Sequence, residues 1–428
     1  MKVLTAKSVQ VGSDLAAWFD AGGGQGLEQA LANPTGIISC LESAGLRGLG
    51  GAGFPTWKKW AAVAAQPPCP DGGGKWLVCN GNEDEPGTFK DRFLLSSTPH
   101  QVIEGALIGA VAVKANQIVL YVNAHEAKML SALRAAVDAW RGHPILARVA
   151  QVVGASVQLQ VCPSSGLYVG GEETAAVSSV MGKFPFPSLK PPFPAEKGVH
   201  GAPTLLNNVE TFAHVTHILR HGPTWYQALG VGKAVGTKLY SLSGDVLRPG
   251  LHELPMGTTL RELVFDHGGG ILAGKQFKAV FTGGPSNTLL TERELDVALD
   301  FDSLCARGSR LGTGAMIVVG VGTSILRKTA EYVGFFAANS CGQCPSCKIG
   351  TYQVSRILER IETGAGRPTD LAALENLARL LPGSGRCGLV DGAATVLGSS
   401  LATFRSEYEG ALRSQSSGGR NEGRSHMG

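Results

Sequence analysis

The run Trp76-Leu77-Val78-Cys79-Asn80 is short and apolar, and a cluster of glycine, amide and carboxylate residues follows it. After a helical pattern over residues 101–113, Gln117-Ile118-Val119-Leu120-Tyr121-Val122 is a second apolar run. Another helical pattern, at residues 127–140, precedes an alternating run at residues 156–161. Strands that alternate with helices in this way form parallel sheets covered by helices. The sequence therefore predicts an α/β domain whose strands point the same way.

The pattern changes twice after this region. Residues 236–320 consist of short strand-like runs and turns, which is typical of a small β-grasp-like module, and residues 325–412 return to helical periodicity. We expect four parts: an α/β region at 1–235, a β-grasp-like domain at 236–324, a helical bundle at 325–413 and a disordered Ser/Gly/Arg-rich tail at 414–428.

Length and composition limit the class of protein. The chain has 428 residues, 43% of them hydrophobic, and a net charge of +4, which is too small and too scattered for nucleic-acid binding. No apolar run reaches the roughly 18 residues that span a bilayer. The first residues also lack the apolar stretch of a signal peptide. These features predict a soluble, cytoplasmic protein that does not insert into a membrane.

Three cysteines lie close together at Cys341, Cys344 and Cys347, and a fourth, Cys387, follows 40 residues later. Thiols spaced C-x2-C-x2-C cannot pair with one another as disulfides, but they suit three corners of a [4Fe–4S] cluster with a remote fourth ligand. The other five of the nine cysteines are widely spread and are expected to be small buried hydrophobic residues. Such a cluster carries single electrons, so the chain should also contain an electron source.

Gly48-Leu49-Gly50-Gly51-Ala52-Gly53 has four glycines in six residues. Exposed backbone N–H groups in such a loop can bind an anion, especially where a helix follows, and Lys58 and Lys59 come just behind it. The same loop could equally be a tight turn, since it is not a G-x-G-x-x-G fingerprint.

Two further polar segments follow predicted strands. Residues 80–85 hold two amides and three carboxylates at a strand end, where ligands bind in parallel sheets. The segment Gly170-Gly171-Glu172-Glu173 follows the strand at 156–161, and Tyr168 beside it could stack on a flat ligand. The alternatives are a solvated acidic turn for the first and a helix N-terminus with favourable charge for the second. Likewise, Asn207 and Asn208 either cap a helix or bind a cofactor.

These motifs occur in the order seen in one family. The segments GxGGAGFPT, CNxxExEPGxFKDR, GGEETA, LKPPFP, NNVET, LPMGTTxREL and SCGQCxxCK with a later lone cysteine cover about residues 45–409. In this combination the chain resembles the NADH-binding flavoprotein subunit of NADH:quinone oxidoreductase (complex I). It equally resembles the diaphorase subunits of NAD-linked hydrogenases and formate dehydrogenases.

The resemblance implies a Rossmann-like FMN/NADH domain with a parallel sheet, followed by the β-grasp-like domain and a helical bundle that carries one [4Fe–4S] cluster. FMN contacts would fall on Gly48, Gly50, Lys59, Asn80, Glu83, Gly171, Glu172, Asn207, Asn208 and Thr211, with Asn82 as a further cofactor-binding candidate. NADH contacts would fall on Phe54, Lys59, Glu85, Tyr168, Glu173 and Phe193, and the cluster ligands on Cys341, Cys344, Cys347 and Cys387.

The implied activity is that of an NADH:acceptor oxidoreductase. NADH would pass a hydride to FMN, and electrons would leave singly through the cluster, or the flow would reverse and reduce NAD+. No side chain is needed as an acid or base. Glu85, Glu172 and Glu173 would tune the site, and the two adjacent glutamates would disfavour the extra phosphate of NADPH. Implied partners are a thioredoxin-like [2Fe–2S] subunit and a larger iron–sulfur, hydrogenase, formate dehydrogenase or complex I arm subunit.

The chain departs from the family pattern at four positions. Leu49 replaces an arginine, Asn82 an aspartate, Gly170 a cysteine and Trp57 a glycine. Rnf-complex C subunits share a G-x-G-G-A-G-F-P-T loop, which Leu49 fits better than an arginine would, so a membrane-associated electron-transfer adaptor that resembles them is an alternative. That family, however, carries two C-x2-C-x2-C-x3-C-P runs, and this chain has a single triad. A binding module with decayed cofactor sites is the other alternative, and the retained cysteines argue against it.

Overall fold

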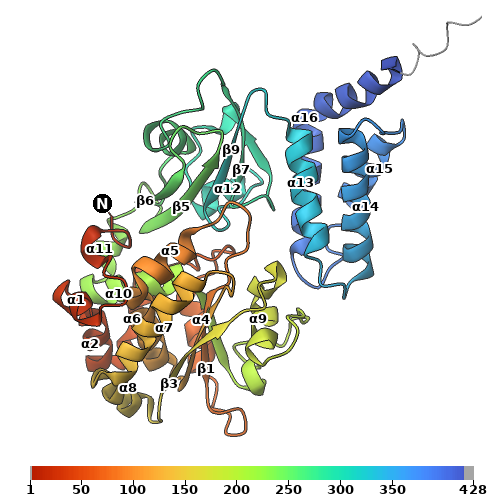
Figure 1. Ribbon diagram of the computed structural model, residues 1–428. Helices are drawn as coiled ribbons and strands as arrows, with labels where there is room; N and C mark the ends of the chain where they lie inside the picture. Colours follow the sequence, from red (N-terminus) through yellow and green to blue (C-terminus); the bar gives the residue numbers. More distant parts are fainter. Residues whose placement is uncertain (1, 419–428) are drawn as a thin grey trace, which may run out of the picture.

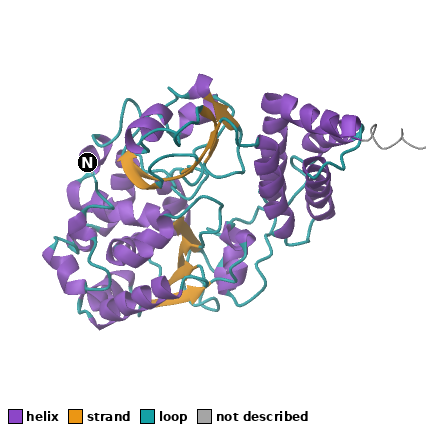
Figure 2. Ribbon diagram, turned by 45° about the horizontal axis from the view of Figure 1, so that its top comes forward, coloured by secondary structure: helices purple, strands orange, loops and turns teal. Residues whose placement is uncertain are grey.

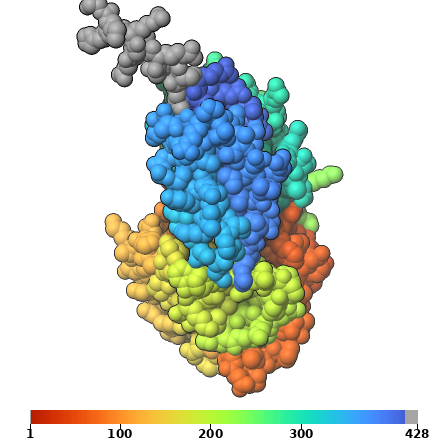
Figure 3. All heavy atoms as spheres, turned by 90° about the vertical axis from the view of Figure 1, so that its right-hand side faces the viewer, coloured from red at the N-terminus to blue at the C-terminus, as the bar shows by residue number. Residues whose placement is uncertain are grey.

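The computed structural model describes residues 2–418, with side chains described as far as residue 413. Its elements form three groups: a large α/β region, a second sheet and a C-terminal helical bundle (Figure 1). The bundle extends from one side of the molecule, and it rests on the α/β region around residues 170–210 (Figure 3). None of the described helices is both long and apolar enough to cross a membrane.

The first sheet has four parallel strands in the order β3-β2-β1-β4. These are β1 (Trp76–Gly81), β2 (Gln117–Val122), β3 (Gln158–Pro163) and β4 (Thr204–Asn208). Strands β2 and β3 follow β1 on one side. Strand β4 lies on the other side of β1, with Asn80 opposite Asn208. The strand order therefore reverses between β1 and β4, which is where open parallel sheets bind ligands. This sheet confirms the predicted α/β fold.

Alternate strand residues face two different cores. The helices of this region are α1 (Leu15–Asp20), α2 (Gln25–Ala32), α3 (Ile37–Ala44), α4 (Thr56–Ala64), α5 (Lys90–Ser97), α6 (Pro99–Val113), α7 (Ala127–Gly142), α8 (Ile145–Val153), α9 (Glu173–Val180), α10 (Val209–His221) and α11 (Pro223–Gln227). Leu77 and Leu120 lie in the larger core with α4, α6 and α10, whereas Val78 and Tyr121 pack against α9 and the nearby loop. Apart from α9, most of these helices crowd one side of the sheet (Figure 2). Short η turns lie at Lys7–Val9, Pro34–Gly36, Tyr168–Gly171 (η3) and Val199–Gly201.

The second sheet is mixed, in the order β6-β5-β9-β7-β8. Its elements are β5 (Thr237–Gly244), β6 (Gly250–Pro255), η5 (Glu262–His267), β7 (Phe277–Thr282), β8 (Leu289–Thr291), η6 (Glu292–Glu294), α12 (Phe301–Ala306) and β9 (Ala315–Gly320). Phe281 and Ile317 on one face of this sheet share a hydrophobic core with the helical bundle. The second sheet therefore joins the bundle to the rest of the molecule.

The helical bundle contains α13 (Ile325–Ala338), α14 (Pro345–Glu362), α15 (Asp370–Leu380) and α16 (Leu389–Gly418). The expected tail at 414–428 is corrected at its start, because α16 reaches Gly418; residues 419–428 lie outside the described part. The second sheet begins with β5 at Thr237, and the bundle begins with α13 at Ile325.

Candidate functional site

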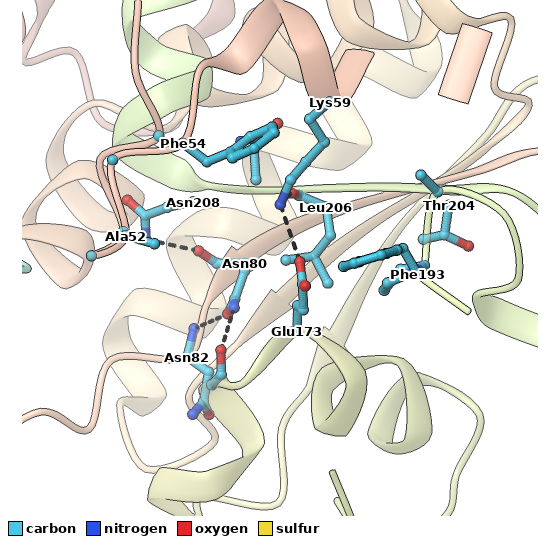
Figure 4. A pocket seen from close by; sticks show the side chains of 18 of the residues that line it. Ala52, Phe54, Lys59, Asn80, Asn82, Glu173, Phe193, Thr204, Leu206 and Asn208 are labelled. Carbon is cyan, nitrogen blue, oxygen red and sulfur yellow. Dashed lines mark hydrogen bonds and ion pairs between the residues drawn. The ribbon is translucent and has the colours of Figure 1, made fainter. Parts of the chain in front are cut away.

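A cavity of about 720 Å³ opens at the carboxyl ends of β1 and β4 (Figure 4). It brings together residues from Gly48 to Thr313, which are 265 positions apart in the sequence. Thirteen of the predicted cofactor-binding residues line it: Gly48, Gly50, Phe54, Lys59, Asn80, Asn82, Glu83, Glu85, Gly171, Glu173, Phe193, Asn207 and Asn208. Three others, Tyr168, Glu172 and Thr211, are not among the lining residues.

The glycine loop forms one wall of this cavity. Gly48 N donates to Phe54 O at 2.8 Å, so the loop closes on itself before α4 begins at Thr56. Gly50 lies so close to β4 that a Cβ there would be 2.8 Å from the Asn208 Cβ. A Cβ on Gly51, in contrast, would meet no atom within 4 Å. The loop is therefore packed tightly from behind and leaves an open cradle in front.

Leu49 and Thr211 support the loop from the protein interior. The Leu49 side chain is fully buried in the main core, and its N–H donates to Thr211 Oγ1 at 2.9 Å. Thr211 therefore supports the loop, and its cofactor contact stays a prediction. Because Leu49 points into the core, its replacement of a family arginine fills apolar space at this position.

Asn80 joins three segments at the base of the cavity. Its Nδ2 donates to Gly171 O at 3.0 Å, its Oδ1 accepts from Asn82 N at 3.0 Å, and its carbonyl accepts from Asn208 Nδ2 at 3.1 Å. Asn208 also caps α10 by accepting from Glu210 N at 3.0 Å. Asn208 therefore caps α10 and also lines the cavity.

The Asn82 amide points away from the centre of the cavity (Figure 4). Its Nδ2 donates to Asp84 Oδ2 at 2.9 Å and to Leu167 O at 3.4 Å. Asp84 also accepts a hydrogen bond from Asn123 at the end of β2. Asn82 stands where the family has an aspartate, and its amide is hydrogen-bonded to the Asp84 carboxylate. The same amide also holds the loop before Gly170 through Leu167 O.

Glu83 is almost completely buried and binds the start of α5. Its carboxylate accepts from Asp91 N at 2.7 Å, from Arg92 N at 3.1 Å and from Arg92 Nε at 3.0 Å. Burial and the neighbouring Asp91 raise the pKa of Glu83. Its principal contacts are therefore with the protein.

Glu85 is different, because Oε1 of its buried carboxyl group has no hydrogen-bond partner among the described residues. Burial raises the pKa of Glu85 to about 7, although the hydroxyls of Tyr168 and Ser286 and the charge of Arg310 act to lower it. An unpartnered buried acceptor beside an open cradle fits a polar ligand.

The Glu85 side chain should make the stability of the cofactor-free chain depend on pH. Its folded pKa of about 7 lies above the ordinary 4.5, so the carboxyl destabilises the fold progressively as the pH rises through this interval. Glu85→Gln removes the titration and should stabilise the chain by roughly 2 kcal/mol more at pH 8 than at pH 5. Urea unfolding at the two pH values measures the difference, and equal effects of the substitution at both would contradict it.

Glu172 and Glu173 have separate positions at the start of α9. Glu172 caps the helix, accepting from Thr174 N at 2.8 Å and Ala175 N at 3.0 Å, and its flavin contact stays a prediction. Glu173 faces the cavity between two lysines, 3.1 Å from Lys59 Nζ and 2.5 Å from Lys190 Nζ. Although burial opposes it, these lysines lower the pKa of Glu173, which is therefore ionised at neutral pH.

Two aromatic side chains flank this charged pair. Phe54 from the glycine loop and Phe193 from the proline-rich segment are each 51% exposed, and their rings lie on either side of Lys59 and Glu173 (Figure 4). Exposed rings are costly in water unless a partner covers them. The arrangement can hold a flat heterocycle near a positive charge.

Lys90 is a cavity residue that the sequence analysis missed. Its buried Nζ lies 2.6 Å from Asp91 Oδ1, 2.8 Å from Asn208 Oδ1 and 3.0 Å from Glu210 Oε2. Glu210 in turn pairs at 2.5 Å with Lys238, which comes from β5 of the second sheet. The Lys-Asp pair in the FKDR segment could have suggested a buried ion pair. The other two partners of Lys90, Asn208 and Glu210, lie more than 100 residues away in the sequence.

Tyr168 is not among the residues that line the cavity. Its ring packs edge-on against Phe335 and Phe336 of α13, with centroids 5.2 and 5.8 Å away. The ring therefore faces the helical bundle, and only its hydroxyl approaches a cavity residue, Glu85.

The four predicted cluster cysteines surround one small pocket in the helical bundle. Polar hydrogens approach three of the sulfurs: Ser340 Oγ lies 3.3 Å from Cys347 Sγ, Arg386 N 3.4 Å from Cys344 Sγ and Gln343 Nε2 3.8 Å from Cys341 Sγ. Helix α14 begins at Pro345, beside this pocket, and the positive end of its dipole favours the thiolate form of the cysteines. Four thiols around one pocket match the ligand set of a [4Fe–4S] cluster.

Comparison with known proteins identifies the family. The Nuo51 FMN-binding domain matches residues 41–217, the SLBB domain residues 239–288, and the NADH-ubiquinone oxidoreductase-F iron-sulfur binding region residues 327–411. The F 2 subunit of the NADH-quinone oxidoreductase of Rhizobium meliloti (strain 1021) is 41% identical over 397 residues, which cover 92% of this chain and 93% of that protein. The chain belongs to the family of F-type subunits of NADH-quinone oxidoreductases.

Other members of this F-type family and its relatives agree. The F-type NADH-quinone oxidoreductase subunit of Escherichia coli (strain K12) is 39% identical over 92% of this chain and 90% of its own. The NADP-reducing hydrogenase subunit HndC of Solidesulfovibrio fructosivorans is 37% identical over 90% of this chain and 78% of its own. A solved NAD+-reducing [NiFe]-hydrogenase chain superimposes with a TM-score of 0.81 at 33% identity, over 93% of this chain and 67% of that one.

The family assignment agrees with the two sites. This chain carries an FMN-binding domain, and its glycine loop and cavity fit a bound flavin nucleotide. It also carries a 4Fe–4S binding region, in which the four cysteines share a pocket. The SLBB domain corresponds to the predicted β-grasp-like module.

Proposed function

We propose that this chain is the NADH-oxidising subunit of a larger electron-transfer complex, a diaphorase that works with FMN and one [4Fe–4S] cluster. The observation that carries the proposal is the presence of both sites in one chain. The cavity at β1 and β4 is joined to the four-cysteine pocket by the single turn of η3, which contributes Gly171 to the first and Val169 to the second.

FMN would be held by the glycine loop on one side and by the amides at the ends of β1 and β4 on the other. When bound, FMN accepts a hydride and the iron–sulfur cluster takes electrons one at a time, so the pair converts two-electron chemistry into one-electron chemistry. The chain's own residues orient the reactants: Asn80 fixes the floor, and Lys90 with Asn208 fixes the end of β4.

NADH would occupy the outer part of the same cavity. Phe54 and Phe193 would cover a flat heterocycle and exclude water, and Lys59 is available to pair with a phosphate. The unpartnered Oε1 of Glu85 can accept a hydrogen bond from a hydroxyl or amide of the nucleotide. Holding the two flat rings in contact is the main contribution that a protein makes to hydride transfer.

The proposed activity is tested with the purified chain, loaded with FMN and cluster. We expect NADH to reduce the flavin and to support ferricyanide reduction, with NADH preferred over NADPH because Glu173 disfavours a further phosphate. Lys59 and Lys190 balance this carboxylate, so Glu173→Gln should reduce the preference without abolishing NADH oxidation.

Steady-state kcat/KM values with the two nucleotides measure the preference. Glu196→Gln is a matched control, since Glu196 also lines the cavity but lies outside this set of ion pairs. A protein that retains FMN and is not reduced by NADH would rule out the proposed function. Equal kcat/KM values for NADH and NADPH would rule out the role of Glu173.

The proposal extends to the partners and the compartment. We infer a thioredoxin-like [2Fe–2S] subunit and a larger iron–sulfur, hydrogenase, formate dehydrogenase or complex I arm subunit, because related chains are named as subunits of NADH-quinone oxidoreductases and hydrogenases. In a hydrogenase or formate dehydrogenase complex the chain would reduce NAD+. All nine cysteines are free, which supports a reducing, cytoplasmic location.

A further inference from the structure

Tyr168 lies between the nucleotide cavity and the four-cysteine pocket. Its hydroxyl approaches the cavity residue Glu85, and its ring contacts Phe335 and Phe336 on α13. The next residue, Val169, lines the cysteine pocket. Tyr168 is thus connected to both sites, although it lines neither of them.

The surroundings of Tyr168 also join the three domains. Glu85 belongs to the α/β domain, and the Ser286 hydroxyl that interacts with it belongs to the SLBB domain. Ser286 itself packs against Gly392 of α16, where a Cβ would lie 2.8 Å from the Ser286 Cβ. Any change at this junction would alter the spacing of the two sites.

We propose that Tyr168 is a positioning residue that bridges the two redox sites and sets the rate at which electrons pass from the flavin site to the cluster. The ring fills the space in front of α13, where it packs against Phe335 and Phe336. This inference rests on the proposed function. It replaces the nucleotide-stacking role with one in electron transfer.

The electron balance is simple. A bound flavin would take both electrons of the hydride that NADH gives up. Each later step would move one electron from the flavin site to the cluster, which would pass it to an external acceptor before taking the next. Tyr168 neither gains nor loses an electron overall. Its contribution is the tight packing across which the transfer occurs, since a void or a shift of the partners loses the contacts along this path.

The test compares Tyr168→Leu with Tyr168→Phe in the chain loaded with FMN and cluster. Stopped-flow absorbance follows flavin reduction by NADH, and rapid-freeze EPR follows cluster reduction. In Tyr168→Leu the ratio of the cluster rate to the flavin rate should fall about tenfold, because small displacements of reacting partners are costly. Tyr168→Phe keeps the ring and should stay close to the wild-type ratio.

Tyr352→Leu is the matched control, because Tyr352 is 58% exposed on α14, outside the junction, and its loss should leave the ratio unchanged. If Tyr168→Leu does not fold, Phe335→Leu weakens the same bridge from α13 and should lower the ratio in the same direction. Hydrogen exchange of α13 in the cofactor-free chain gives a second measurement, and it should be faster in either leucine variant.

Two results would overturn the inference. A wild-type ratio in a folded, fully loaded Tyr168→Leu protein would show that the bridge does not affect the transfer. Equal slowing of flavin and cluster reduction would show that Tyr168 acts on the reaction with the nucleotide and not on the transfer to the cluster. A wild-type protein whose flavin NADH does not reduce would instead reject the proposed function, so the two failures are distinguishable.

Discussion

Replacing Glu210 with glutamine should lower the free energy of unfolding by about 3–5 kcal/mol, because it leaves the buried Lys238 ammonium without its carboxylate partner. Lys90 Nζ lies 3.0 Å and Lys238 Nζ 2.5 Å from the Glu210 carboxylate, and all three side chains are at most 1% exposed. Although burial opposes it, the two lysines lower the pKa of Glu210. Burial lowers the pKa of Lys238 to about 8, so at pH 7 the pair is still charged.

Chemical denaturation at pH 7, followed by circular dichroism, measures this effect. Glu28→Gln is a matched control, since Glu28 pairs with Arg148 on the surface and its loss should cost less than about 1 kcal/mol. The double variant Glu210→Gln/Lys238→Met restores the charge balance and should recover part of the lost stability. A Glu210→Gln protein as stable as the Glu28→Gln control would show that this buried network does not hold the two domains together.

Replacing Cys387 with serine should remove the [4Fe–4S] cluster or convert it, while FMN content and NADH:ferricyanide activity remain. The reason is that Cys387 closes the ring of cysteines, whereas none of the cysteines lines the nucleotide cavity. Iron and sulfide analysis together with EPR of the reduced protein measures the cluster. Ferricyanide is expected to take electrons from the flavin directly, so this activity reports on the other site.

Cys305→Ser provides the control for this substitution. Cys305 is an exposed cysteine on α12, apart from the cysteine pocket, and its replacement should leave iron content, FMN and activity unchanged. An unaltered cluster EPR signal in Cys387→Ser would contradict the assignment of the fourth ligand. Loss of FMN in the same variant would show that the two sites depend on each other for folding.

The sheet, the helical bundle and the main motifs of the two sites could be predicted because each depends on residues that are close together in the sequence. β1 and β2 are continuous apolar runs, and the three cysteines Cys341, Cys344 and Cys347 lie within seven residues. The Gly48–Gly53 loop and the Glu172–Glu173 helix start are also local. Periodicity and spacing act over a few residues, so such features can be recognised without knowing the fold.

The protein contacts of individual side chains could not be predicted. The η3 turn directs the ring of Tyr168 toward α13. Glu172 caps α9, and Thr211 accepts a hydrogen bond from the Leu49 backbone N–H. In each case the residue type suits both roles equally well. Only the direction of the backbone decides which of the two partners is within reach.

The amino-acid sequence was sufficient for the kind of chemistry: a glycine loop and strand-end amides for a nucleotide, and four cysteines for an electron carrier. The tertiary structure alone decided how the two are connected, because Lys90, Glu210 and Lys238 meet across two domains and Tyr168 meets α13 across more than 160 residues of chain. Local patterns specify which groups a segment offers. Which of those groups are buried together depends on chain folding that brings distant segments into contact, and burial is what makes their charges and packing matter.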